Sequence, residues 1–110
     1  MSEWREMHRS LPFPYPGGRF PLDLGAAIQR TVLTGDEPAR VVVHDADGDW
    51  AIGDGVNDPN LPGAVVATHI HHIVERDPSV GELASMPPGW KAERDEPGEK
   101  WRRSWHHYDS

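Results

Sequence analysis

Hydrophobic positions occur in short runs between prolines and glycines, which predicts many short elements and no long helix. The clearest runs are two β-rich segments, residues 41–44 and 49–52, which flank a turn rich in Asp and Gly. This arrangement predicts a β-hairpin. Residues 64–67 follow a Pro/Gly/Asn-rich loop and are typical of a buried strand.

A second hairpin is predicted over residues 90–105, with Pro97-Gly98 as the central pair of a type II turn. With that turn at the tip, Trp90 faces Trp105, Glu93 faces Arg102, and Arg94 faces Trp101. Opposite charges, paired aromatics and a cation over an aromatic ring each stabilise a hairpin by roughly 0.2–1 kcal/mol. The agreement of these pairs supports the register.

Three short helices are predicted, near residues 24–33, 69–76 and 79–85. In the first, Leu24, Ala27, Ile28 and Val32 lie near one helical face, although a strand at 28–33 is the alternative.

The second predicted helix has Thr68 as its N-cap and places Ile70, Ile73 and Val74 on one face. The third follows Asp77-Pro78, an N-cap followed by a proline at the first helical position.

These elements predict an α+β fold, with a mainly antiparallel sheet of two hairpins plus a central strand and two or three short helices on one face. Residues 1–22 contain four prolines and are expected to form an extended arm, held down by Phe13, Tyr15 and Phe20. We expect residues 23–107 to form a single α+β domain and residues 108–110 to be a tail.

Composition narrows the classes of partner. The formal charge of −7 over 110 residues disfavours nucleic acid and anionic membranes and is compatible with a basic protein partner. The absence of cysteine excludes disulfides and thiolate chemistry. The charged start without an apolar core and the lack of a long apolar run predict no secretory signal, no membrane span and a cytoplasmic protein.

The segment THIHHIVE, residues 68–75, is the strongest candidate for metal chemistry. In a strand, His69 and His71 would share a face, with Glu75 four residues later, as metal ligands require. The spacing from Gly63 to Glu75 resembles the first motif of the cupin barrels. The alternative function is therefore a small metal-dependent, cupin-like enzyme that uses His69, His71 and Glu75.

Two observations oppose the cupin interpretation. The position where the second cupin motif carries a ligand histidine is Ala92, and no chain remains for strands between the motifs. If residues 68–76 are helical, His69 and His71 lie about 160° apart and cannot share a metal. His71 then pairs with Glu75, and His69 lies beside His72. We therefore predict a solvated helix face with no metal or other cofactor.

Acidic loops are the other candidate site. The segment DADGDW resembles a calcium loop, but loop positions six and twelve are Trp50 and Val56 instead of glycine and glutamate. No nucleophile elbow or phosphate-cradling loop is present, so no catalytic residue is predicted. The hypothesis is a binding surface formed by exposed aromatics and five aspartates, which are Asp45, Asp47, Asp49, Asp54 and Asp58.

Several segments together resemble a family of small bacterial domains of unknown function, some of which are regarded as immunity proteins of polymorphic toxin systems. The matching segments are residues 44–50, 53–55, 73–79 and 88–90, with Arg94 and Trp101. Members more usually carry an aromatic residue after the position of Trp50, where this chain has Ala51. The resemblance implies a compact α+β fold, no established catalytic residues, and a role in binding and neutralising a toxin. We therefore expect a non-catalytic protein-binding domain, not an enzyme, with a basic partner such as a toxin and an oligomeric state left open.

Overall fold

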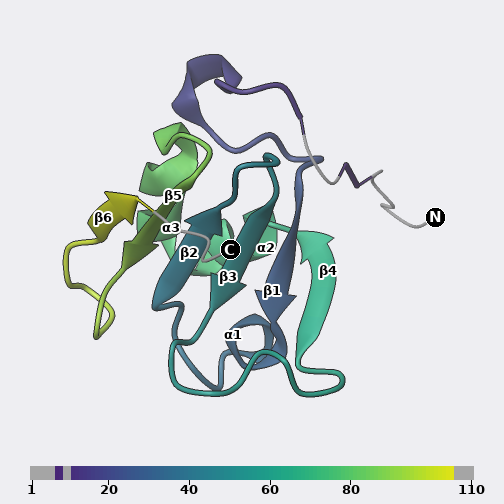
Figure 1. The fold of residues 1–110 in the computed structure, drawn as a ribbon, viewed down its shortest axis with the longest axis vertical. Coiled ribbons are helices and arrows are strands. Elements are labelled where there is room, and N and C mark those ends of the chain that lie inside the picture. Colours follow the sequence, from purple (N-terminus) through teal and green to yellow (C-terminus); the bar gives the residue numbers. More distant parts are fainter. Residues whose placement is uncertain (1–6, 9–10, 106–110) are drawn as a thin grey trace.

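A six-stranded mixed β-sheet with short helices forms the protein in the computed structural model, which describes residues 7–8 and 11–105 (Figure 1). The strands are β1 (Gly25–Gln29), β2 (Val41–His44), β3 (Trp50–Gly53), β4 (Val65–His69), β5 (Trp90–Glu93) and β6 (Arg102–Trp105). The helices are α1 (Arg30–Thr34), α2 (His71–Arg76) and α3 (Pro78–Gly81), with short 3₁₀ turns η1 (Pro16–Gly18) and η2 (Glu82–Ser85). The α+β class is confirmed.

Both predicted hairpins are present in the sheet, whose strand order is β4-β1-β3-β2-β5-β6. β2 and β3 pair antiparallel, as do β5 and β6, and Trp90 faces Trp105 while Glu93 faces Arg102. Gly98 has a φ of +88°, and the Glu99 N–H donates to the Glu96 carbonyl, which closes the turn at the tip. The sequence-derived register of this hairpin is therefore confirmed.

The predicted helix at 24–33 is wrong, because its first half is strand β1. β1 pairs parallel with β3 and antiparallel with β4, so the sheet is mixed, although four of its five strand pairings are antiparallel. The strand predicted at 64–67 is β4, which lies at the edge of the sheet and not at its centre. Ala26 and Ile28 are buried, and the exposed Ala27 between them points to the opposite face, as successive side chains of a strand do. The alternative strand at 28–33 is also misplaced, since β1 ends at Gln29 and α1 follows directly.

The core lies between one face of the sheet and the helices. In Figure 1, α2 and α3 lie behind the sheet, and none of the described helices covers the face toward the viewer. The buried side chains of β1, β2 and β3 include Ile28, Val42 and Trp50, and they belong to the same cluster as Ile73 and Leu83 of the helical layer. The predicted placement of short helices on one face is confirmed for α2, α3 and η2.

The described part of the N-terminal arm is held against this core. Tyr15 is buried, and its hydroxyl accepts a hydrogen bond of 2.7 Å from the indole Nε1 of Trp50. Phe13 and Phe20 are partly buried against the core. The remainder of the predicted arm, residues 1–6 and 9–10, and the predicted tail lie outside the described residues.

Among the described residues, no helix has the length and apolar character needed to cross a membrane.

Candidate functional site

The sheet face without helices carries small apolar side chains. Ala67, Ala27, Ala51 and Val43 are directly paired neighbours across β4, β1, β3 and β2. The three alanines are exposed, because their side chains point away from the helical layer. We call this surface the open face and define it by six residues: Ala27, Val41, Val43, Ala51, Val65 and Ala67.

Two shallow hollows adjoin each other on the open face, with volumes of about 500 and 350 Å³. Both hollows are lined by Ala27 and Ala51, so they form one continuous apolar depression. Toward β5 the surface becomes charged, where the Lys91 ammonium lies 3.4 Å from the Glu93 carboxylate. An apolar centre with a charged border is the usual composition of a protein-binding surface.

The loop between β2 and β3 borders the larger hollow with Asp45 and Asp49. The Asp45 carboxylate accepts backbone N–H bonds from Asp47 at 2.9 Å and from Asp49 at 3.1 Å. Asp45 therefore fixes the turn, whereas Asp47 is exposed to solvent at its tip. Asp45 and Asp49 are half-buried at the border.

The loop after β3 borders the smaller hollow through Asn57 and Pro59. Asp58 is exposed in this loop, and its carboxylate accepts one N–H bond from Asn60 at 2.9 Å. Exposed acids therefore stand on loops at both ends of β3, on either side of the apolar depression.

The predicted surface position of Asp54 is wrong, because Asp54 is fully buried. Burial alone would raise its pKa, but hydrogen bonds from the Asn57 N–H, the Thr31 hydroxyl, the Asn57 amide and the Val56 N–H lower the pKa to about 2. Asp54 thus remains charged and organises the loop from within. A buried carboxylate in this network is not available to a partner.

The residues of the alternative metal site, His69, His71 and Glu75, lie where β4 meets α2. The predicted Thr68 cap is wrong, because β4 extends through His69 and α2 begins at His71 with Ile70 as its N-cap. His69 is therefore outside the helix, and its ring centroid lies only 5.7 Å from that of His71. The expected separation of these two side chains by about 160° does not occur.

The contact predicted between His71 and Glu75 is present, with 3.9 Å between Nε2 and Oε1. The structure adds His72, whose ring lies 4.5 Å from His71 and 5.9 Å from His69, measured between centroids. His71, His72 and Glu75 each place one ligand atom within 4.8 Å of the others. We call these three residues together with His69 the histidine cluster. The alternative metal site read from the sequence contained three of these residues and did not include His72.

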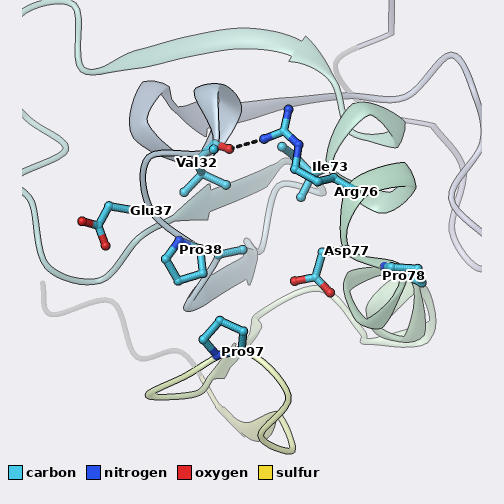
Figure 2. Close-up of a pocket in the computed structure, with 10 residues that line it drawn as sticks. Val32, Glu37, Pro38, Ile73, Arg76, Asp77, Pro78 and Pro97 are labelled. Carbon is cyan, nitrogen blue, oxygen red and sulfur yellow. Dashed lines mark hydrogen bonds between the residues drawn. The ribbon is translucent and has the colours of Figure 1, made fainter.

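A further hollow, of about 420 Å³, lies between α1, α2 and the tip of the β5–β6 hairpin (Figure 2). Arg76 projects from α2 across its border, and its guanidinium donates to the Val32 and Leu33 carbonyls at 2.8 Å each. These bonds satisfy carbonyls at the C-terminal end of α1. Three charged residues that line this hollow, Glu37, Arg76 and Asp77, are engaged in hydrogen bonds or ion pairs within the protein.

Asp77 at the same hollow belongs to a buried network centred on Arg94. The Arg94 guanidinium forms an ion pair with Asp77 and donates to Ser79 Oγ at 2.9 Å and to the Ala39 carbonyl at 3.0 Å. It also lies 4.2 Å from the ring centroid of Trp101, as the sequence predicted. Burial would raise the pKa of Asp77, but hydrogen bonds from Ser79 and Arg94 lower it. Asp77, Ser79, Arg94 and Trp101 therefore have a structural role, since they join the end of β5 to α3.

The fold and these surfaces define an α+β domain with one helix-covered sheet face and one apolar open face between acidic loops. The chain matches no protein-family model, no curated protein and no solved structure in the comparisons made.

Proposed function

We propose that the protein is a non-catalytic protein-binding domain that uses the open face and its acidic borders to hold a basic partner. The observation that carries the proposal is the continuous apolar depression on the open face, bordered by the two loops that also carry the exposed Asp47 and Asp58. Contiguous apolar patches on a protein surface often mark sites of protein–protein interaction when they are large. Small side chains make this depression shallow, so it fits an apolar protrusion on the partner.

Charge supports a basic partner. The chain carries a net charge of −7, and exposed aspartates border the apolar depression at both ends of β3. Such a border accelerates association with a positively charged protein and disfavours acidic ones. Within this class, inhibition of a toxin by direct binding is the specific role that we propose, as the resemblance to immunity proteins implies.

The test is binding to the protein encoded by the neighbouring gene, purified separately and measured by calorimetry. Ala51→Arg places a long cation at the centre of the open face and should weaken the affinity at least about tenfold, because it fills the depression and repels a basic partner. Ser85→Arg, at an exposed position in η2, is the matched control and should leave affinity unchanged. Equal affinity for both variants and the wild type would refute the open face as the binding surface.

A metal-dependent enzyme is the second candidate, and the histidine cluster is the observation that favours it. The cupin form of this candidate is wrong, because the sheet is open, with β4 and β6 as its two edges, and does not close into a barrel. The hollows described above are lined by residues outside the histidine cluster. Protein binding therefore remains the function that we propose.

A further inference from the structure

The junction of β4 and α2 gathers donor groups that suit a transition-metal ion. We propose that His71, His72 and Glu75 bind one Zn²⁺-class ion, with water completing the coordination. Two imidazoles and one carboxylate are a donor set that binds zinc in proteins. The proposal concerns the helical layer and is independent of the open face and of its partner.

The geometry comes from the helix. Successive residues differ by 100° around a helix, so Glu75 falls between His71 and His72 in angle, one turn later along the axis. The three ligand atoms lie within 4.8 Å of one another. Ligands at 2.0–2.1 Å around a tetrahedral zinc are separated by roughly 3.4 Å, so the side chains need to converge by at most about 1.4 Å. The Glu75 side chain is 74% exposed, which leaves it free to make that movement.

The backbone that presents these side chains is anchored. Ile70 and Ile73 are buried, and the Ile70 N–H donates to the Leu24 carbonyl of the neighbouring segment at 3.0 Å. The first turn of α2 is thereby fixed to the sheet, and only the side chains need to adjust.

The imidazole of His71 is not held by hydrogen bonds at both of its nitrogens. Its Nδ1 is buried and has no hydrogen-bond partner among the described residues, and its Nε2 lies 3.9 Å from Glu75 Oε1. Binding of a metal at Nε2 would therefore replace only this long contact with Glu75.

The experiment uses the full chain without an affinity tag, in a His106→Gln/His107→Gln background that removes the other adjacent histidine pair. The protein is stripped with EDTA and titrated with Zn²⁺ by calorimetry and with Co²⁺ by visible absorption. We expect one saturable equivalent of Zn²⁺ and Co²⁺ bands of low-symmetry coordination. His72→Gln and Glu75→Gln should each lower the Zn²⁺ affinity at least about tenfold, since even residues behind the ligands contribute that much.

His71→Gln should have the same effect as the other two substitutions. His72 and Glu75 are exposed, so their variants should fold even if the half-buried His71 variant does not. Glu96→Gln, an exposed glutamate at the tip of the β5–β6 hairpin, is the matched control and should bind as the parent does. Weak binding without a defined stoichiometry, or an affinity unchanged in His72→Gln and Glu75→Gln, would show adventitious binding only and overturn the proposal.

Discussion

Among single residues, Asp54 is a buried charge whose two carboxylate oxygens both accept hydrogen bonds. Its carboxylate accepts hydrogen bonds from Thr31 Oγ at 2.6 Å, from Asn57 Nδ2 at 2.7 Å and from the N–H groups of Val56 and Asn57. Every one of these partners donates, so an amide nitrogen in place of a carboxylate oxygen would face a donor. A charged acid is therefore required at this position.

Asp54→Asn should destabilise the protein by about 2 kcal/mol at pH 7, measured by urea unfolding. The folded-state pKa of about 2 lies below the usual 3.8, so the unfolded chain binds the proton more readily. The stabilisation is complete above about pH 5 and is lost as the pH falls toward 2. The gap between wild type and Asp54→Asn should therefore close at low pH.

The control for this residue is Asp58→Asn, which removes an exposed aspartate from the same loop. Its unfolding free energy should differ from the wild type by at most about 0.5 kcal/mol at pH 7. A loss as large as that of Asp54→Asn would indicate a general effect of loop charge instead of the buried network.

At the scale of elements, the contacts of Arg94 join the β5–β6 hairpin to α3. Arg94 is 2% exposed and reaches Asp77, Ser79 and Trp101 from the end of β5. Arg94→Leu should lower the free energy of unfolding by about 3 kcal/mol, because it leaves the Asp77 carboxylate without its cation. Denaturant unfolding followed by tryptophan fluorescence measures the loss.

Arg102→Leu is the matched control for that change, since Arg102 is exposed and its guanidinium lies 3.4 Å from the Asp95 carboxylate. An exposed ion pair contributes roughly 0–1 kcal/mol, so this variant should unfold almost as the wild type does. Similar losses for both arginines would argue against a special role of the buried network.

The elements differ in how far the sequence determined them. The two hairpins and the Asp77-Pro78 helix start were predicted correctly, because turn residues and cross-strand pairs lie close together in the chain. β1 was not, because Leu24, Ala27, Ile28 and Val32 fit a helical period equally well. This segment is a strand because it pairs with β3 and β4, and those partners are distant in sequence.

The candidate sites show the same division. The aspartate-rich loops were recognisable from composition. The burial of Asp54 was not, because it becomes clear only when Thr31 of α1, which is distant in sequence, is seen to donate a hydrogen bond to its carboxylate. The histidine cluster was recognisable from spacing, but its geometry depends on the change from strand to helix after His69. The open face had no signal in the sequence, because Ala27, Ala51 and Ala67 become neighbours only once the strand order is known.

At the scale of the whole molecule, helices cover one face of the sheet, and the other is left to an apolar depression with acidic borders. The two faces of the sheet therefore differ in role, one in stability and the other in the proposed binding. The helical layer and the buried Arg94 and Asp54 networks hold the fold, while the open face has few internal contacts to lose. Substitutions on the open face should therefore affect binding more than stability, and substitutions in the networks should do the reverse.

The salt dependence of partner binding tests this division. Asp47→Asn/Asp58→Asn removes one exposed charge at each end of the depression. The double variant should bind the protein encoded by the neighbouring gene about twofold to fivefold more weakly at low salt, mainly through slower association. Its affinity should also fall less steeply with added salt, because fewer charges remain to be screened. Stopped-flow association at several salt concentrations measures both effects.

The control variant Glu82→Gln/Glu96→Gln also removes two negative charges, but from exposed positions outside the open face and its loops. If the acidic borders steer the partner, this control should keep the steep salt dependence of the wild type, since local charge acts within about 10 Å at 0.1 M salt. If instead only the net charge of −7 matters, both double variants should lose salt dependence equally. Equal loss would remove the loops from the binding surface and leave the apolar depression alone as the candidate contact.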